Sequence, residues 1–297
     1  MSAILVTGIN GQIGFELGRI FGVSGEVRML TRSQMDLADE ASILGALRTY
    51  RPKIIVNSAA YTAVDHAESN RDQAMAVNAV APGIMARYAA DHDAMIIHYS
   101  TDYVFDGKKT SPYTEDDQVN PQSVYGETKW LGEEAIRASG VRHLILRTSW
   151  VYGLHGENFP KAILRLARER SSLSVVADQV GAPTSAAMVA DATKMMVERA
   201  ADGLSDCKLG TYHVAAEGST SWYRYAEHII RLATSKNFEL LVTFDKLIPI
   251  STAEYPSRAK RPANSQLDCS KLRHNFGLSL PSWELSVNEF ISELVSS

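Results

Sequence analysis

The chain has 297 residues, a hydrophobic fraction of 45% and a formal net charge of -4 at pH 7. This composition is typical of a globular protein with one large domain or two of ordinary size, and the net charge argues against nucleic acid or an anionic membrane as the main partner. The first residues, MSAILVTG, carry no positive leader, and no apolar run reaches transmembrane length. We therefore expect a first strand there, no membrane segment and a cytoplasmic protein.

Short apolar runs in the first half predict buried strands over residues 3–7, 26–30, 53–57, 94–100 and 143–148. Between these strands, helical periodicity predicts helices over residues 14–21, 40–50, 72–92 and 124–139. Apolar runs without alternation indicate strands that are buried on both faces, and the interposed helices supply the crossovers of a parallel sheet. We therefore predict an α/β fold in which residues 1–150 form a Rossmann-type domain with a doubly wound parallel sheet.

The pattern changes after Trp150. It predicts helices over residues 159–170, 186–201, 221–234 and 284–294, and strands over 173–177 and 211–215. We expect residues 151–297 to form a smaller α/β substrate-binding lobe, and a segment near 184–215 is a candidate to return to the sheet. The proline-containing stretch PISTAEYPSRAKRPANS, residues 249–265, predicts a loop that is too long for a passive connector.

A glycine-rich turn lies between the first predicted strand and the first predicted helix. The segment VTGINGQIG spaces Gly8, Gly11 and Gly14 three residues apart. Glycines at such a turn let the backbone approach a pyrophosphate, whose charge then lies at the free amides of a helix N-terminus. The first two glycines are separated by two residues instead of the usual one, so a tight turn without a ligand is the alternative.

The segment after the second predicted strand bears on the choice of nicotinamide cofactor. An acid there would accept a hydrogen bond from the ribose and repel a 2′-phosphate, whereas this chain has LTRSQMDL. Thr31 and Arg32 can hold a 2′-phosphate, so we predict NADPH, with NADH as the alternative. Asp36 follows further along and is expected near the adenine. The alternative for Arg32 is a solvated loop charge.

Tyr125 and Lys129 lie four positions apart in SVYGETKWLGEEAIRAS and therefore share one face of a predicted helix. Free phenols and ammonium groups titrate near pH 10, at about 10 and about 10.4. A nearby ammonium favours the phenolate, so we expect Lys129 to lower the pKa of Tyr125 and make it a proton donor and acceptor at neutral pH. The alternative is a chance pair on a helix surface.

A pair of hydroxyl residues, Ser100 and Thr101, directly follows a predicted parallel strand in HYSTDYVFDG. Ligands of such sheets bind at the carboxyl ends of the strands, where a hydroxyl can reach both a substrate carbonyl and the phenol. A glycine turn, a hydroxyl after the fourth strand, and a tyrosine and lysine on the next helix follow one another in order. Together they predict a catalytic site formed by Thr101, Tyr125 and Lys129.

These motifs resemble those of the dTDP-4-dehydrorhamnose reductases, a family of the extended short-chain dehydrogenases/reductases. The resemblance covers essentially the whole chain and rests on TGINGQIG, IVNSAAYTAVDHAE, HYSTDYVFDG, VYGETKWLGE, LRTSWVYG, VVADQVGAPT, YHVAAEG, SWYRYA and RPANSQLD. It implies that the substrate is the dTDP-linked keto-deoxysugar dTDP-4-dehydro-6-deoxy-L-mannose. Its 4-keto group would receive hydride from NADPH or NADH and a proton from tyrosine, giving dTDP-L-rhamnose for cell-wall polysaccharide.

The resemblance also implies residue roles, position by position. Cofactor contacts at the pyrophosphate turn, the adenine, and the ribose and nicotinamide are implied for Gly11, Gln12, Ile13, Asp36, Leu37, Ala60, Tyr61, Thr62 and Tyr99. Thr101, Asp102 and Trp150 would contact the sugar. Tyr125 and Lys129 would carry the chemistry.

Several other side chains have two interpretations. Arg258 and Arg261 in the long loop could clamp the substrate diphosphate or could be solvated. Trp222 could line the sugar site or fill the core. We interpret Asp65 as a surface or capping group and His98 as an ordinary strand residue.

Metal binding and oligomerisation depend on one departure from the family pattern. Some members bind magnesium at a dimer contact through several glutamates, and Glu16 matches one of them. Ala186 and Ala187 stand where another would lie and cannot ligate a metal. We therefore expect no functional metal and a monomer or weak homodimer. The two cysteines, Cys207 and Cys269, match no metal-ligand spacing, and we assign them no role.

Two other functions remain open at the level of sequence. The first is another nucleotide-sugar 4-ketoreductase or an epimerase of the same superfamily. Related dehydratases place an acid in a TDEVYG motif, whereas this chain has Tyr103 at that position, which favours simple reduction. The second is a non-catalytic regulatory subunit that resembles that of methionine adenosyltransferase. The presence of Thr101, Tyr125 and Lys129 favours catalysis.

Overall fold

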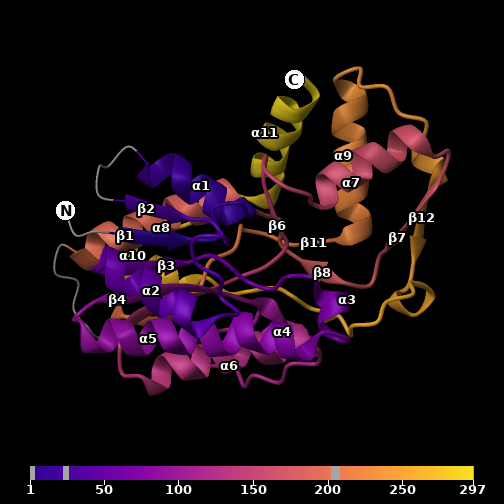
Figure 1. Cartoon of the computed structure of the whole chain (residues 1–297). Helices are drawn as coiled ribbons and strands as arrows, with labels where there is room; N and C mark the ends of the chain where they lie inside the picture. Colours follow the sequence, from indigo (N-terminus) through magenta and orange to yellow (C-terminus); the bar gives the residue numbers. More distant parts are fainter. Residues whose placement is uncertain (1–3, 23–26, 202–207, 297) are drawn as a thin grey trace.

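The computed structural model describes residues 4–22, 27–201 and 208–296 (Figure 1). Ala3 and Glu26, the first residues of two predicted strands, and Cys207 lie outside these ranges. Within them, no helix combines the length and the apolar character that crossing a membrane requires.

Within the described residues, a six-stranded parallel sheet forms the centre of the larger part of the molecule. Its strands, in spatial order, are β2 (Val27–Leu30), β1 (Ile4–Thr7), β3 (Ile54–Asn57), β4 (Met95–Thr101), β5 (Arg142–Thr148) and β10 (Gly210–His213). Every residue of β3 and β4 is buried, as the unbroken apolar runs predict for strands covered on both faces. The predicted doubly wound parallel sheet is confirmed.

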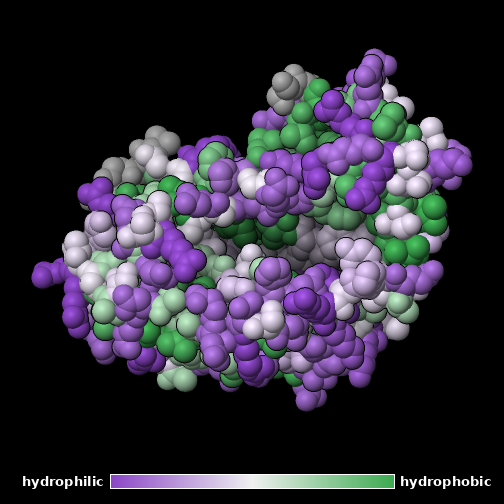
Figure 2. Space-filling model, turned by 45° about the vertical axis from the view of Figure 1, so that its right-hand side comes forward, coloured by the Kyte–Doolittle hydropathy of each residue, from purple (hydrophilic) through white to green (hydrophobic). Residues whose placement is uncertain are grey.

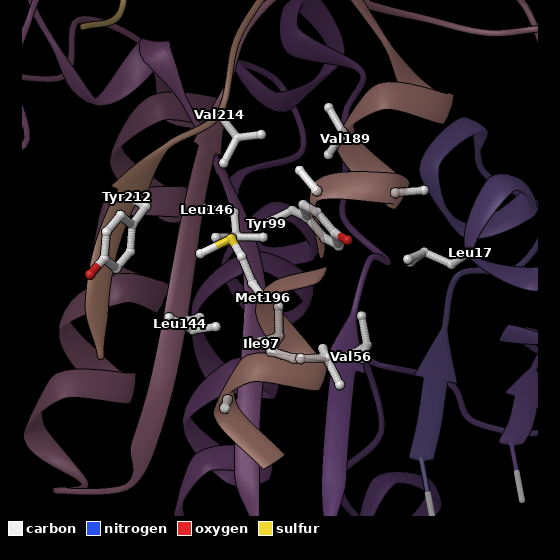
Figure 3. Packing of buried hydrophobic residues seen from close by; sticks show 14 of the residues in the cluster. Leu17, Val56, Ile97, Tyr99, Leu144, Leu146, Val189, Met196, Tyr212 and Val214 are labelled. Carbon is white, nitrogen blue, oxygen red and sulfur yellow. The ribbon is translucent and has the colours of Figure 1, made fainter. Parts of the chain in front are cut away.

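Helices cover both faces of this sheet (Figure 1). One face carries α1 (Gln12–Phe21), α8 (Ala186–Ala201) and α10 (Ser270–Phe276), and the other carries α2 (Glu40–Tyr50), α5 (Ala81–Asp91) and α6 (Val124–Ala138). Figure 3 shows the packing on the first face, where Met196 of α8 lies against Leu146 and Tyr99 of the sheet. Burial of these side chains contributes about 25 cal/mol per Å² of apolar surface and fixes the strand ends that carry the site.

The predicted single helix over residues 72–92 is wrong in one respect, because it is interrupted. It consists of α4 (Arg71–Met75), the π-helix η1 (Ala76–Val80) and α5. The wider turn places Asn78 against the segment after β3, where its Oδ1 accepts from the amide of Tyr61 at 2.8 Å and its Nδ2 donates to the carbonyl oxygen of Tyr61 at 3.0 Å. The π-helix therefore holds Tyr61, and π-helical turns are often found at functional sites. A short helix, α3 (Val64–Ala67), follows Tyr61.

A smaller lobe lies beside the sheet (Figure 1). Its helices are α7 (Phe159–Glu169), α9 (Trp222–Ser235) and α11 (Trp283–Ser296), which share a hydrophobic core. Three strand pairs connect its loops: β7 (Leu173–Val176) with β12 (Leu247–Ile250), β8 (Val180–Gly181) with β11 (Thr220–Ser221), and β6 (Val151–Tyr152) with β9 (Thr184–Ser185). α8 and β10 lie between β9 and β11 in the sequence, but they belong to the larger part, where α8 packs on the sheet and β10 pairs with β5. The division into domains at residue 150 stays a prediction.

Candidate active site

A cavity of about 680 Å³ opens at the carboxyl ends of β1, β3, β4 and β5. Figure 2 shows a hollow near the centre of this face of the molecule, with hydrophobic residues in its depth. The chain passes from β1 outward to β2 and then back across to β3, so the strand order reverses beside β1. Open α/β sheets bind ligands in the crevice at such a reversal.

Most of the predicted site residues line this cavity. They are Gly8, Gly11, Gln12, Ile13, Arg32, Asp36, Leu37, Ala60, Tyr61, Thr62, Tyr99, Thr101, Asp102, Tyr125, Lys129 and Trp150. Three predicted residues that the structure also describes, Gly14, Arg258 and Arg261, lie outside the lining.

The glycine-rich turn forms a cradle at one end of the cavity. Gly8 has a φ of 72°, and a Cβ there would lie 2.7 Å from the amide nitrogen of Ala59. A Cβ on Gly14 would lie 2.0 Å from the carbonyl oxygen of Gly8, so this glycine lets α1 pack closely on the turn. Gly11 is the N-cap of α1 and, having no side chain, leaves the first helical amides available to a ligand. The cradle fits the pyrophosphate of a dinucleotide.

Arg32 and Asp36, in the segment after β2, also line the cavity. Their side chains form a loose ion pair of 3.5 Å and are 76% and 40% exposed. An exposed pair of this kind contributes about 0–1 kcal/mol, so Arg32 can turn toward a phosphate at little cost. The arrangement suits a 2′-phosphate of NADPH.

The proposed proton donor, Tyr125, lies in the first turn of α6. Ser123 caps this helix by accepting from the amide of Gly126 at 3.2 Å, and the ring of Tyr103 packs edge-on against Tyr125 with centroids 5.4 Å apart. Burial of the phenol raises the pKa of Tyr125 to about 12, while the hydroxyl of Thr101 lowers this pKa in part. The expectation that this pKa is lowered is therefore wrong, because the loss of hydration on burial dominates.

Lys129 is 2% exposed and points into the sheet edge. Its Nζ donates to the carbonyl oxygen of Tyr99 at 2.5 Å and lies 3.2 Å from Nε2 of His98. Burial lowers the pKa of Lys129 to about 8, although the carboxylate of Glu133 opposes this shift. Lys129 therefore exchanges its proton closer to neutrality than an ordinary lysine does.

Thr101 is the last residue of β4, and Asp102 follows it directly. The Thr101 hydroxyl donates to Oδ1 of Asp102 at 3.0 Å and accepts from the amide of Tyr103 at 3.1 Å. Burial raises the pKa of Asp102 to about 6, and hydrogen bonds from Ser265 and Thr101 counteract part of that rise. These two side chains present hydrogen-bonding groups to the cavity near the phenol.

Trp150 forms an aromatic wall of the cavity just after β5. Its φ of 49° lies in the left-handed region, which is strained for a bulky residue. The indole stacks on Trp222 with ring centroids 3.5 Å apart and an interplanar angle of 10°. Its other face lies over Gly181, where a Cβ would meet the ring at 2.5 Å. Trp222 thus packs behind the wall and also contacts Phe159 in the lobe core.

Comparison with known proteins gives a consistent relationship. The family model described as the RmlD substrate binding domain matches residues 1–296. The dTDP-4-dehydrorhamnose reductase of Burkholderia thailandensis is 42% identical over 298 residues, covering 99% of this chain and 99% of that protein. That of Escherichia coli is 42% identical and covers 99% of this chain and 98% of its own length. The chain belongs to the dTDP-4-dehydrorhamnose reductase family.

A solved member of the reductase family gives the same relationship in three dimensions. The enzyme of Bacillus anthracis, solved in complex with NADP, is 33% identical to this chain and superposes with a TM-score of 0.89. The alignment covers 98% of this chain and 99% of that one. This relative binds the cofactor that Arg32 predicts here.

The long loop of this reductase is held by an ion pair that the sequence interpretation did not anticipate. Asp65, which we interpreted as a surface or capping group, accepts from the amides of Arg258 and Ala259 at 3.1 and 3.0 Å. It also pairs with Nη2 of Arg261 at 2.5 Å, and the Arg261 guanidinium lowers the pKa of Asp65. Asp65 thus anchors the loop. That Arg258 and Arg261 bind substrate phosphates stays a prediction.

Two further residues of the reductase cavity were missed. Thr148 and Ser149 line it, and within the described chain their buried hydroxyl oxygens have no hydrogen-bond partner. Buried polar groups are normally paired, so these hydroxyls suit a polar ligand. The rule that identified Thr101, a hydroxyl directly after a parallel strand, would have identified them as well.

The expectation that the protein has no functional metal is based on Glu16, Ala186 and Ala187. Glu16 is 5% exposed and accepts from Nε of Arg19 at 2.8 Å, which raises the pKa of that guanidinium. Within the described residues, no group of three or more His, Cys, Asp or Glu side chains is arranged to hold a metal ion. That the reductase has no functional metal stays a prediction.

Proposed function

We propose that the protein reduces the 4-keto group of dTDP-4-dehydro-6-deoxy-L-mannose to give dTDP-L-rhamnose, with NADPH as the preferred cofactor. It is an NAD(P)H-dependent oxidoreductase. The observation that carries the proposal is that Thr101, Tyr125 and Lys129 line the same cavity as the glycine cradle at Gly8 and Gly11. Reductases named for this reaction are 42% identical over nearly the full length.

The chain's own residues bind the dinucleotide in an extended crevice. The amides at the start of α1, beside Gly11, hold the pyrophosphate, and Arg32 holds the 2′-phosphate. Lys129 and Tyr61, which line the same cavity, are proposed to contact the ribose and the nicotinamide. The bound reduced nicotinamide supplies the hydride that goes to sugar carbon four.

Tyr125 supplies the proton that completes the reduction. With its pKa near 12, the phenol carries its proton throughout the physiological pH range, which is the form that a proton donor needs. The hydroxyl proton of Tyr125 goes to the ketone oxygen, the product leaves as an alcohol, and the phenolate recovers a proton from solvent. A charged Lys129 nearby stabilises the phenolate while it lasts.

The sugar end of the cavity combines polar and aromatic side chains. Thr101 and Asp102 provide hydrogen-bonding groups, and the hydroxyls of Thr148 and Ser149 have no partner in the described chain. The indole of Trp150 adds an aromatic side chain to the same lining. A deoxysugar, with hydroxyls around a partly apolar ring, fits this combination.

The decisive experiment supplies dTDP-4-dehydro-6-deoxy-L-mannose with NADPH or NADH and follows loss of the reduced nicotinamide absorbance. Tyr125→Phe should lower kcat by about 10²–10⁴-fold and leave dinucleotide affinity nearly unchanged, because it removes only the donated proton. Tyr88→Phe is the matched control, since the Tyr88 hydroxyl donates to the carbonyl oxygen of Leu47 away from the cavity.

Three outcomes would count against the proposal. Full activity of Tyr125→Phe would remove the assigned donor. NAD that stays bound through purification and is recycled would indicate an epimerase. An obligate partner enzyme, with no turnover of any keto-sugar nucleotide, would indicate a regulatory subunit.

Location and assembly are part of the same proposal. A cytoplasmic enzyme would have access to the reduced dinucleotide pool. A monomer or weak homodimer is supported by Ala186 and Ala187, which offer no metal ligand where a metal-bridged dimer contact would need one. Light scattering with and without added magnesium tests this point, and a stable magnesium-dependent dimer would contradict it.

A further inference from the structure

Three buried polar side chains lie side by side on adjacent strands, two at the ends of their strands and one in the middle of β4. Thr7 of β1 pairs in register with Asn57 of β3, which pairs in register with His98 of β4. All three are at most 2% exposed. We call these residues the polar row. Polar groups at this depth need partners, and the row satisfies them by bonding across the strands.

The polar row ends at the lysine of the site. The hydroxyl of Thr7 donates to Oδ1 of Asn57 at 2.7 Å, and Nδ2 of Asn57 lies 3.0 Å from Nδ1 of His98. On its other side, Nε2 of His98 lies 3.2 Å from Nζ of Lys129. Thr7 also accepts from the amide of Ala59 at 3.3 Å, so both ends of the row are fixed.

The donors and acceptors of the row determine which nitrogen of His98 carries the proton. Burial lowers the pKa of His98 well below its ordinary value, so the imidazole is neutral and has one N–H and one acceptor. Nδ2 of Asn57 is a donor, so the facing Nδ1 accepts. The imidazole proton is therefore on Nε2 and points at Lys129.

A flip of the Asn57 amide would exchange Oδ1 and Nδ2 and would place the imidazole proton on Nδ1. The other hydrogen bonds of the polar row disfavour this flip. Nδ2 would then face the hydroxyl of Thr7, which already accepts from the amide of Ala59. The Thr7 hydroxyl proton would lose Oδ1 as its acceptor. A buried hydroxyl that loses its acceptor is destabilising, so the orientation with Nδ2 toward His98 is favoured.

An N–H on Nε2 of His98 distinguishes the two forms of Lys129. The uncharged amine has a lone pair and can accept this N–H, whereas the ammonium has only donors. The other groups around Lys129 are the carbonyl oxygen of Tyr99, which accepts from it, and the carboxylate of Glu133, which favours the charged form. Glu133 is itself bonded to Arg147 of β5 and Arg137 of α6, so its charge is largely engaged elsewhere.

We propose that His98, oriented by Asn57 and Thr7, is a positioning residue that holds Lys129 in place and favours its uncharged amine. The inference rests on the proposed function only in that Lys129 serves Tyr125 there. The protonation equilibrium of Lys129 on α6 then depends on side chains of β1, β3 and β4.

Two measurements on the folded protein test this without any sugar substrate. In wild type, ¹⁵N NMR of labelled histidine should show His98 as the neutral Nε2–H tautomer. In ¹³C-lysine-labelled protein, with the Lys129 signal identified by its loss in Lys129→Arg, His98→Leu should raise the pKa of Lys129 by about one unit. That is the size expected from the loss of one neutral hydrogen bond.

Two further variants separate a specific effect from a structural one. His98→Gln can still donate an N–H and should restore most of the wild-type pKa of Lys129. His213→Leu removes another imidazole that is 0% exposed, on β10, and should leave the Lys129 titration unchanged. With sugar substrate, kcat can be measured as a function of pH. The limb of this pH profile that is absent in Lys129→Arg reports Lys129, and in His98→Leu it should move by the same number of pH units as the pKa of Lys129.

The outcomes are distinct from those that test the reaction. An Nδ1–H tautomer in wild type, or an unshifted Lys129 in His98→Leu, would overturn the role of His98 even if the enzyme is active. If His98→Leu does not fold, the tautomer of His98 in wild type still decides the question. A shifted Lys129 in a protein that reduces no keto-sugar would retain the positioning role and reject the reaction.

Discussion

Gly181 offers a one-methyl test of the aromatic wall. A Cβ at this position would lie 2.5 Å from Cε2, 2.8 Å from Nε1 and 2.9 Å from Cζ2 of Trp150. Ordinary carbon contacts are about 3.5–4.0 Å, so in Gly181→Ala the indole must move by about 1 Å. Trp222 stacks on the opposite face with centroids 3.5 Å away and is itself backed by Phe159, so the ring has no free space behind it.

Overpacking of this kind costs about 1–3 kcal/mol, which corresponds to a loss of Tm on the order of 5 °C for a chain of this size. Because Trp150 lines the sugar end of the cavity, we expect KM for the sugar nucleotide to rise about tenfold in Gly181→Ala, equivalent to about 1.4 kcal/mol. Dinucleotide affinity should not change, since the glycine cradle is formed by other segments.

Calorimetry, fluorescence titration with NADPH and steady-state kinetics measure these three quantities. Gly45→Ala is the matched control, because a Cβ on Gly45 in α2 meets no atom within 4 Å. Alanine is the better helix former, so this variant should be as stable as wild type or slightly more stable. Unchanged Tm and KM in Gly181→Ala would refute the reasoning, since they would mean that Trp150 is not confined as described.

Gly14→Ala should abolish dinucleotide binding or folding, because its Cβ would lie 2.0 Å from the carbonyl oxygen of Gly8. Circular dichroism reports folding and NADPH titration reports binding, and normal binding would contradict the close packing of α1. Burial raises the pKa of Asp102 from 3.8 to about 6, so its neutral form stabilises the native state below about pH 4 and this contribution disappears as pH rises through 6. Urea unfolding of Asp102→Asn should therefore lack a slope worth about 3 kcal/mol across that range, and an identical slope in both proteins would disprove the assignment. Asp65→Ala should cost about 1–2 kcal/mol, after allowance for partial exposure, and should speed proteolysis of the loop that Asp65 anchors; wild-type proteolysis would show that the loop is held otherwise.

Much of the fold could be predicted because its strands and helices follow from the local pattern of apolar residues. Unbroken apolar runs gave the strands β1 to β5 within about a residue, and helical periodicity gave α2 and α6. The π-helix at residues 76–80 could not be predicted, since it depends on Asn78 reaching the backbone of Tyr61, a contact between segments that no local periodicity reports. The two-residue strands of the smaller lobe are likewise fixed by partners that are distant in sequence.

The sequence predicted which residues line the cavity better than it predicted their electrostatics. The order of motifs brought Thr101, Tyr125 and Lys129 to one cavity. The pKa of Tyr125 was predicted in the wrong direction, because a sequence does not report how much water a side chain loses on burial. The role of His98 was missed for a related reason, since it arises from the register of three strands.

β10 is the last strand of the sheet along the chain, and more than half of the polypeptide separates it from β1. It forms one edge of the sheet by pairing with β5. While the chain emerges from the ribosome, β5 therefore keeps an open hydrogen-bonding edge until Gly210–His213 has been made. At about 5–20 residues per second, this interval lasts some seconds. An uncovered apolar edge is prone to pair with other chains, so the nascent protein passes through a period in which chaperones have a clear target.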